Sequence, residues 1–131
     1  MVKEITKKEV TKFCETFFPQ YKITNDPFEK YLGYYEGELV GIITYSIIYE
    51  RAEINYICVR EEFQGKQIGS KLMEEVLNQI KNECDSISLE VASDNITAIN
   101  LYKKYGFKEV SIREKYYVGK DALLFVRKLG D

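Results

Sequence analysis

The sequence predicts an α+β fold: a mixed sheet with an antiparallel N-terminal meander, one central parallel strand pair and flanking helices. Residues 30–59 form apolar, β-favouring runs separated by turn residues, as expected of antiparallel strands. Residues 67–84 instead repeat their apolar side chains at helical spacing, and a strand-like run follows at 86–92. A strand, a helix and a further strand in succession predict a right-handed crossover between parallel strands.

Length and composition indicate one soluble domain, spanning residues 1–131. The formal net charge is −2, so no concentrated basic face for nucleic acid is indicated. Met1 is followed by a charged segment rather than a signal peptide, and no apolar run is long enough to span a membrane. Three widely spaced cysteines argue against a disulfide framework and predict a cytoplasmic location: Cys14, Cys58 and Cys84.

The first helix is predicted to begin after Thr6, which forms a capping-box pattern with Glu9. It should end by Pro19, since proline does not continue a helix. One face of this helix is apolar, formed by Val10, Phe13, Cys14 and Phe17. A short helical turn is also expected after Pro27.

Three strands follow, predicted at 30–35, 39–49 and 53–59. The first two flank a tight turn in which Gly37 is free to adopt a positive φ. The short connections between them predict an antiparallel meander.

The helix at 67–84 is amphipathic, because its apolar stripe lies opposite lysines, glutamates and asparagines. The stripe consists of Ile68, Leu72, Val76 and Ile80. A second helix is predicted at about 95–105, ending at Gly106. Two final strands are predicted near 107–113 and 121–129.

The stretch EEFQGKQIGSKL, residues 61–72, has the features of an anion-binding turn that leads into a helix. Backbone N–H groups at a helix start are unpaired, and the helix dipole favours a negative charge there. A P-loop is excluded, because three residues separate Gly65 from Gly69 and the lysine follows the serine. A dinucleotide fingerprint is absent. A purely structural turn with two glycines remains an open alternative.

Two motifs in this chain resemble those of the GNAT acetyltransferase superfamily. The family pattern Asn-x-x-Ala-x-x-Leu-Tyr-x-x-x-Gly-Phe is complete at Asn95, Ala98, Leu101, Tyr102, Gly106 and Phe107. The family's Gln/Arg-x-x-Gly-x-Gly/Ala turn is matched at Gln64 and Gly69 but not at Gln67. The resemblance covers the chain from about residue 31 to the C-terminus.

By this resemblance the cofactor is acetyl-CoA, bound where the two parallel strands splay apart. The turn expected at its pyrophosphate comprises Gln64, Gly65, Lys66, Gln67, Ile68, Gly69 and Ser70. The backbone expected to pair with the pantetheine arm and the acetyl carbonyl is that of Ile57, Cys58 and Val59. Asn95 is expected to contact the pantetheine or nearby backbone. If position 67 requires a positive φ, a glutamine there costs about 1 kcal/mol.

A narrower resemblance is to the protein N-terminal acetyltransferases, and within them to the bacterial ribosomal-protein alanine N-acetyltransferases. It rests on LEVASDN, LYKKYGF and REKYYVGKDALLFVRKL. It implies that Glu90 is the base and Tyr102 the acid. The chemistry is consistent, because a protonated N-terminal amine with a pKa of about 8 must lose a proton before attack. The chain has no histidine to take that proton.

Each of these residues also has a structural interpretation. Glu90 alternates with apolar neighbours as an exposed strand residue does, and Tyr102 fits a packing aromatic. Cys58 lies next to the expected acetyl group, but its apolar strand favours an inert thiol over an acyl-cysteine. Tyr116 and Tyr117 are expected to contact the acceptor peptide, or else to belong to an ordinary surface hairpin. Four further tyrosines are alternatives for the acceptor groove: Tyr34, Tyr35, Tyr45 and Tyr56.

We therefore expect acetyl transfer from acetyl-CoA to a primary amine, namely a protein N-terminal α-amine, by direct transfer in a ternary complex. Two alternatives remain open. One is an acetyltransferase for a small amine such as a polyamine, amino sugar or antibiotic. The other is a non-catalytic acyl-CoA-binding regulatory module. The N-terminal region is short for this fold, and the sequence leaves open whether the chain forms a homodimer.

Overall fold

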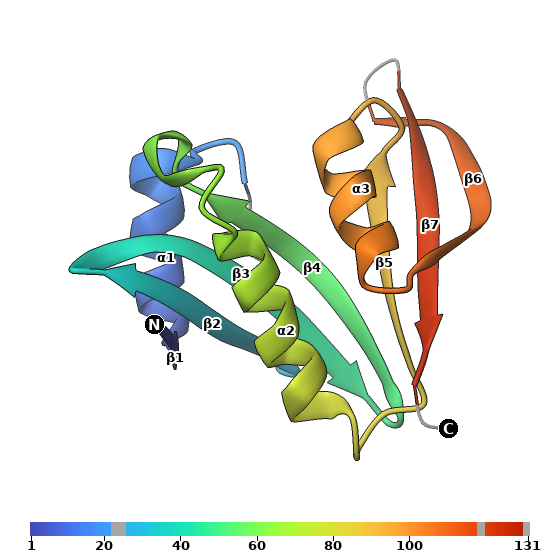
Figure 1. The fold of residues 1–131 in the computed structure, drawn as a ribbon, viewed down its shortest axis with the longest axis horizontal. Helices are drawn as coiled ribbons and strands as arrows, with labels where there is room; N and C mark the ends of the chain where they lie inside the picture. Colours follow the sequence, from blue (N-terminus) through green and yellow to red (C-terminus); the bar gives the residue numbers. More distant parts are fainter. Residues whose placement is uncertain (22–25, 118–119, 130–131) are drawn as a thin grey trace.

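The computed structural model describes residues 1–21, 26–117 and 120–129, with the side chains of 115–117 also outside the description. The described chain forms a seven-stranded sheet in the order β1-β2-β3-β4-β5-β7-β6. Only β4 and β5 are parallel neighbours within it. Figure 1 shows α2 and α3 on one face and α1 on the other. The predicted mixed sheet with one central parallel pair is confirmed.

The elements agree with the predicted ranges to within a few residues. Their bounds are β1 Val2–Glu4, α1 Lys7–Phe17, β2 Glu29–Glu36, β3 Glu38–Ile48, β4 Arg51–Val59, a 3-10 turn Glu61–Phe63, α2 Ile68–Ile80, β5 Ser86–Ala92, α3 Ile96–Lys104, β6 Lys108–Tyr117 and β7 Lys120–Lys128. Gly37 and Gly106 have the positive φ angles that their turns need, 76° and 85°.

One strand was not predicted, and one local prediction is wrong. Val2–Glu4 forms an edge strand on β2, which the sequence did not indicate because three residues show no alternation. The helical turn expected after Pro27 is a plain turn, in which Asp26 accepts a hydrogen bond from the backbone N–H of Phe28. An aspartate side chain that bonds the backbone two residues later favours a turn over a helix.

The start of α1 agrees with prediction. The hydroxyl of Thr6 accepts from the N–H of Glu9, and the Glu9 carboxylate accepts from the N–H of Thr6, each at 3.1 Å. The helix buries Val10, Phe13 and Cys14, whereas Phe17 stays 39% exposed at its end. The apolar face of α1 is therefore shorter than predicted.

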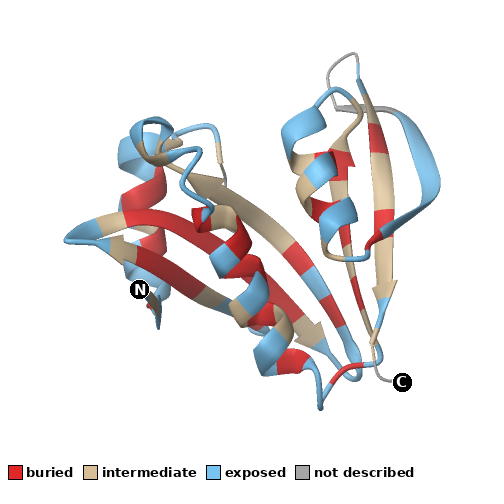
Figure 2. Ribbon diagram, in the orientation of Figure 1, coloured by how far each residue is buried: buried red, intermediate tan, exposed pale blue. Residues whose placement is uncertain are grey.

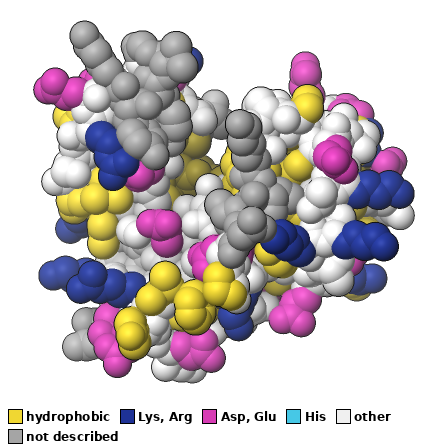
Figure 3. All heavy atoms as spheres, turned by 180° about the vertical axis from the view of Figure 1, so that it is seen from behind, with side chains coloured by type: hydrophobic (Ala, Val, Ile, Leu, Met, Phe, Trp, Pro, Cys, Tyr) yellow, Lys and Arg dark blue, Asp and Glu magenta, His cyan; other side chains and the backbone are white. Residues whose placement is uncertain are grey.

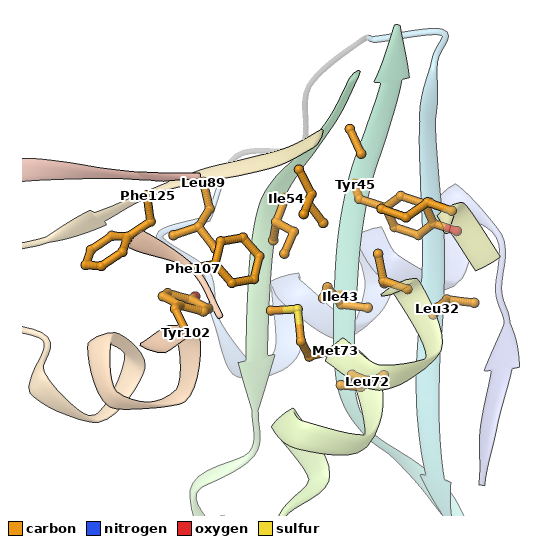
Figure 4. Close-up of a cluster of buried hydrophobic side chains, with 14 of the residues drawn as sticks. Leu32, Ile43, Tyr45, Ile54, Leu72, Met73, Leu89, Tyr102, Phe107 and Phe125 are labelled. Atoms are coloured by element: carbon orange, nitrogen blue, oxygen red, sulfur yellow. The ribbon is translucent and has the colours of Figure 1, made fainter. Parts of the chain in front are cut away.

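The sheet has two separate apolar clusters, one on each face. The larger one packs α2 and α3 against the sheet and contains Leu72, Met73, Tyr102, Phe107 and Phe125. Figure 4 shows these side chains together, and Figure 2 shows how burial concentrates on the sheet side of both helices. The smaller cluster lies under α1 and includes Ile42 of β3. Within the described chain, no helix is long and apolar enough to cross a membrane.

The parallel pair is short. In the described residues β4 pairs with β5 only from Arg51↔Ser86 to Glu53↔Ser88. Beyond that point the strands separate, and Figure 1 shows two halves diverging from a common lower end. β5 instead pairs with β7 along its whole length. The expected splay at the parallel junction is therefore present.

Candidate active site

A cavity of about 580 Å³ occupies the splay between β4, the turn before α2, and α3; we call it the splay cavity. Ten of the predicted cofactor residues line it: Ile57, Cys58, Val59, Gln64, Gly65, Gln67, Ile68, Gly69, Ser70 and Asn95. The fold thus brings together three segments that are far apart in the sequence. Lys66 does not line the cavity; its ammonium lies 5.2 Å from the ring centroid of Phe63.

The turn before α2 depends on two residues with left-handed backbone. Gly65 has φ 82°, and Gln67 has φ 63° and ψ 24°. Position 67 therefore does require positive φ, which is uncommon for a glutamine. The Gln64 amide donates to the carbonyl of Val59 at 3.1 Å and ties this turn to the end of β4.

The start of α2 presents unpaired donors to the cavity. Gln67 is the N-cap, and its side chain makes no capping hydrogen bond. The first backbone N–H groups of a helix have no partner within the helix. Gly69 and Ser70, in the first turn, both line the cavity. Donors and the positive helix dipole together suit an anion such as a pyrophosphate.

The opposite wall is a strand edge. Beyond Glu53, β4 is paired with β3 on one side only, among the described residues. Unpaired backbone groups on such an edge can bond an extended chain laid beside them. Ile57, Cys58 and Val59 belong to this edge and line the cavity. The geometry suits an extended, amide-containing arm.

The third wall is α3, whose N-cap residue is Asn95. The Asn95 side-chain oxygen accepts from the N–H of Ala98 at 3.2 Å, which caps the helix. Asn95 was predicted to contact the ligand, whereas five other wall residues were not predicted. These are Phe18, Phe63, Thr97, Ala98 and Leu101. The complete motif at 95–107 could have indicated Ala98 and Leu101, whereas Phe18 comes from a distant segment with no motif.

Tyr102 lies on the same helix and faces both the cavity and the core. It is 5% exposed, and its ring lies 5.9 Å from that of Phe107 and 6.5 Å from that of Phe125. Figure 4 shows it between α3 and these rings. Because it also lines the cavity, its packing role and a role in chemistry are compatible.

Glu90 lies on the other face of β5. Its neighbours Leu89 and Val91 are buried in the cluster under α3, so the Glu90 side chain projects to the opposite side. Its carboxylate is 3.5 Å from the guanidinium of Arg113 on β6, and the side chain is 28% exposed. The two predicted catalytic residues are thus on opposite faces of the sheet, beside the gap where β4 leaves β5.

A second carboxylate near Glu90 was not predicted. Glu53 is paired with Ser88 across the parallel junction. Ser88 lies two residues before Glu90, on the same face of β5. Partial burial raises the pKa of Glu53, and the negative charges of Glu90 and Asp26 raise it further. The sequence offered one indication that Glu53 belongs near the site. It lies in the same strand as Ile57, four residues earlier.

Cys58 lines the splay cavity and packs on the side of α1. Burial raises the pKa of the Cys58 thiol far above its ordinary value, with a further contribution from Cys14. A thiol with a raised pKa is a poor nucleophile. This agrees with the interpretation of Cys58 as an inert thiol.

The remaining tyrosine predictions have mixed outcomes. Tyr34 and Tyr45 are buried in the cluster under α2, so they do not line a groove on the acceptor side. Tyr56 instead lies on the α1 face, stacked on Tyr21 with ring centroids 3.8 Å apart. The predicted contact residues Tyr116 and Tyr117 end β6, but their side chains lie outside the described part of the structure.

Comparison with known proteins identifies related chains. Residues 2–107 match the Acetyltransferase (GNAT) family. N-alpha-acetyltransferase 30 of Dictyostelium discoideum is 31% identical over 97% of this chain and 72% of its own. A putative [ribosomal protein bS18]-alanine N-acetyltransferase of Bacillus subtilis is 32% identical over 79% of this chain and 72% of its own. The crystal structure of the ribosomal-protein-S18-alanine N-acetyltransferase from Escherichia coli has a TM-score of 0.87 at 18% identity, covering 100% of this chain and 94% of that one.

The family match covers most of the chain and includes both the turn before α2 and the motif at 95–107. The splay cavity fits the family's cofactor, because it combines free donors at a helix start with an unpaired strand edge. Both features were expected from the resemblance. The chain therefore belongs to the GNAT acetyltransferase family, and it is an acetyl-CoA-dependent N-acetyltransferase.

Proposed function

We propose that this enzyme acetylates the α-amine at the N-terminus of a protein, by direct transfer in a ternary complex. The main support is the arrangement of Glu90 and Tyr102 on opposite faces of the sheet, beside the gap that opens where β4 separates from β5. The donor then occupies the α3 face and the acceptor approaches from the other. The relatives named for N-terminal acetylation favour a protein acceptor.

The acceptor face has room for a polypeptide. α1 packs on this face against β2, β3 and β4, whereas β5 and β7 have their helix on the opposite face (Figure 1). Seen from behind, the molecule is hollowed between the two halves of the sheet (Figure 3). An extended peptide entering this hollow would bring its first residue to Glu90.

In this proposal the turn and α2 hold the pyrophosphate, and the edge of β4 pairs with the pantetheine arm. The backbone donors are those of the cavity-lining residues Gly65, Gln67, Ile68, Gly69 and Ser70, and the Gln64 side chain ties the turn to β4. The edge residues are Ile57, Cys58 and Val59, and Asn95 stands at the far wall. Acetyl-CoA supplies a thioester carbonyl that an uncharged amine attacks.

Glu90 takes a proton from the acceptor ammonium, directly or through water. An ammonium cannot attack a carbonyl, because its nitrogen has no free electron pair. The guanidinium of Arg113 lies 3.5 Å from the Glu90 carboxylate and restricts its position. Glu90 is partly exposed, so a proton that it accepts can leave to solvent.

Tyr102 gives a proton to the departing thiolate. Its position among Phe107 and Phe125 keeps the hydroxyl in one place beside the cavity. Direct transfer is favoured over an acyl-enzyme, because the nearest thiol, Cys58, has a raised pKa.

Changing Tyr102→Phe removes the hydroxyl and keeps the ring that packs on Phe107. We expect kcat to fall by about 10²-fold, since a positioned acid contributes 10²–10⁴-fold. Affinity for CoA and thermal stability should change little. Steady-state kinetics and calorimetric titration measure these quantities, and an unchanged kcat would remove Tyr102 as the acid.

The acceptor class is tested by a screen with acetyl-CoA as donor. Peptides with a free N-terminus are compared with the same peptides blocked at the α-amine, and with polyamines, amino sugars and aminoglycosides. We expect turnover only of peptides with a free α-amine, and mass spectrometry should locate the added acetyl group at that amine. Turnover of small amines alone would contradict the proposal. Tyr116 and Tyr117 remain predicted peptide contacts, to be tested with the preferred peptide as Phe variants.

A further inference from the structure

A second cavity, of about 650 Å³, lies at the closed end of the splay, where β4 and β5 still pair. It is separate from the splay cavity and shares none of its lining residues. Its walls come from the end of the β3–β4 hairpin, the start of β5 and the segment before β2. Four carboxylates and one cation line it, namely Asp26, Glu50, Glu53, Asp85 and Arg51. We call it the acidic pocket.

The pocket opens on the acceptor face. Its lining includes Glu53 and Ser88, which are opposite each other in the parallel register. Ser88 and Glu90 project on the same side of β5, since both alternate with buried residues. Two residues of a strand span about 7 Å, so the pocket begins about 7 Å from the expected position of the acceptor amine.

One wall of the pocket is fixed by hydrogen bonds. The Ser46 hydroxyl donates to the Asp26 carboxylate at 2.6 Å, and the Asn55 amide donates both to Ser46 and to Glu29 at 2.8 Å. The hydrogen bond from the Ser46 hydroxyl and the one from the N–H of Phe28 lower the pKa of Asp26. Asp26 therefore stays ionised at neutral pH and keeps its place in the pocket wall.

The rim of the pocket is apolar and exposed. Tyr49 is 94% exposed and has a left-handed φ of 56°, and Ile48 beside it is 48% exposed. Both line the pocket. Figure 3 shows hydrophobic side chains gathered at the lower edge of this face, where the β3–β4 hairpin ends. Apolar groups around a charged pocket suit the long alkyl stem of a lysine or arginine.

We propose that the acidic pocket binds a basic side chain of the acceptor polypeptide, near its third residue. This rests on the proposed N-terminal acetylation and adds a sequence preference to it. An extended peptide advances about 3.3 Å per residue, so its third residue lies about 7 Å from the α-amine, where the pocket begins. The four carboxylates of the pocket attract a cation, and they repel an acidic side chain at the same position of the peptide.

The test uses peptides that differ only at position 3, with Lys, Gln or Glu. For the wild type we expect kcat/KM to fall from Lys to Gln to Glu, and the differences to shrink in 0.5 M salt. Glu50→Lys leaves three carboxylates against two cations in the described lining and should reduce the preference for Lys. Arg51→Gln removes the cation found among the described lining residues and should increase the preference for Lys. Exposed charge pairs change affinity by about two- to fivefold each, which is the expected size of both effects.

Glu36→Lys is the matched control, because it makes the same charge change at the end of the β2–β3 hairpin, outside the pocket. It should leave the Lys-to-Gln ratio as in the wild type. An equal response of Glu36→Lys and Glu50→Lys would show a general charge effect and overturn the proposal.

The same measurements distinguish a failure of the pocket assignment from a failure of the proposed N-terminal acetylation. If the Gln peptide is acetylated but Glu50→Lys leaves the Lys-to-Gln ratio unchanged, the pocket assignment is overturned and N-terminal acetylation stands. If no peptide is acetylated, the proposed function fails and the pocket assignment fails with it. If Glu50→Lys affects only the turnover of spermidine, the pocket binds a free polyamine and the peptide assignment is wrong.

Discussion

Gln67 has the most unusual backbone in the turn that is proposed to bind the pyrophosphate. Its φ of 63° lies in the region that residues with a side chain rarely adopt. The amide direction at this position is nevertheless set by φ and ψ, not by the side chain. A glutamine in this conformation therefore points its N–H as a glycine would, at a cost in stability.

Replacing Gln67 by glycine should relieve that cost. The left-handed region costs a non-glycine residue about 1–2 kcal/mol, and glycine loses about 0.5–1 kcal/mol more chain entropy on folding. We therefore expect Gln67→Gly to raise the free energy of unfolding by about 0.5–1 kcal/mol, measured by urea titration. CoA affinity should change by less than about threefold.

Gly65→Ala is the control for Gln67→Gly. A Cβ at Gly65 meets no atom within 4 Å, so only its φ of 82° makes the change unfavourable. This variant should be destabilised where Gln67→Gly is stabilised. A large gain in CoA affinity for Gln67→Gly would show instead that the glutamine side chain obstructs the ligand.

Glu90 and Glu53 are the two carboxylates beside the gap, and their roles are separable. Glu90→Gln should lower kcat/KM for a neutral peptide by about 10²-fold or more, because it removes the base. Glu53→Gln should keep activity within a few fold. If Glu53→Gln has the larger loss, Glu53 is the base and Glu90 supports it.

The pKa of Glu53 offers an independent check. Since the charge of Glu90 contributes to raising it, Glu90→Gln should lower the pKa of Glu53 toward its ordinary value, as an NMR titration of the carboxyl would show. A raised carboxyl pKa favours folding below its ordinary value, and this contribution is lost as pH rises through the folded pKa. Glu53→Gln should therefore stabilise the protein at pH 7 and not at pH 3.

Among the elements, the β4–β5 pair depends on tertiary structure, whereas helix α1 is determined by a local capping signal. The parallel pair ends after Glu53↔Ser88, where β4 separates from β5 while β5 stays paired with β7, and the cavity lies where the ladder would have continued. α1 is defined locally, by the two hydrogen bonds between Thr6 and Glu9. Its end supplies Phe18 to the splay cavity, so the cap also positions a wall of the site.

Removing the α1 cap should destabilise the protein without altering the sheet. Thr6→Ala is expected to cost about 1 kcal/mol of unfolding free energy, or about 3–5 °C in melting temperature. Thr16→Ala is the matched control, because Thr16 bonds the carbonyl of Lys12 inside the same helix and caps nothing. Equal losses for both variants would contradict a specific capping contribution.

The Glu9 half of this cap should depend on pH. Hydrogen bonds from the Thr6 N–H, from Tyr35 and from the Thr6 hydroxyl lower the pKa of Glu9. A lowered carboxyl pKa contributes stability above the ordinary value, near 4.5, and this is lost as pH falls through the folded pKa. Glu9→Gln should therefore be less stable than the wild type at pH 7 and equal to it at pH 3.

For the molecule as a whole, the two halves of the sheet are hydrogen-bonded to each other, among the described residues, only at the closed end of the splay, and the splay cavity lies above that end. A ligand that contacts both halves stabilises the folded chain by mass action. At 100 times its dissociation constant this amounts to about 2.7 kcal/mol. CoA should therefore raise the melting temperature.

Gly69→Leu should abolish that rise. A Cβ at Gly69 would lie 3.6 Å from Leu101 and 3.9 Å from Ile57, on opposite walls of the cavity, so it enters the splay without a clash. A leucine there fills space that the ligand needs. Scanning fluorimetry should show a stable protein that no longer responds to CoA, with Gly69→Ala intermediate. A full response of Gly69→Leu would exclude this cavity as the CoA site.

The sequence by itself determined the elements and the family. Apolar periodicity is a local property, so α2 and its stripe from Ile68 to Ile80 were predictable residue by residue. The motif from Asn95 to Phe107 and the turn from Gln64 to Gly69 indicated the cofactor, and the contacts predicted for it remain a proposal. Edge strand β1 was not predictable, because three residues become a strand only when β2 is beside them.

The tertiary structure alone decided on which face of the sheet each site residue lies relative to the helices. Strand alternation placed Glu90 opposite its buried neighbours, but only the packing of α3 showed that this face is turned away from Tyr102. Tyr34 and Tyr45 were candidates for the acceptor groove because they are tyrosines, yet both are buried under α2. The acidic pocket joins residues from position 26 to position 88, and no local pattern links them. Such sites depend on contacts between distant segments, which are a property of the folded chain.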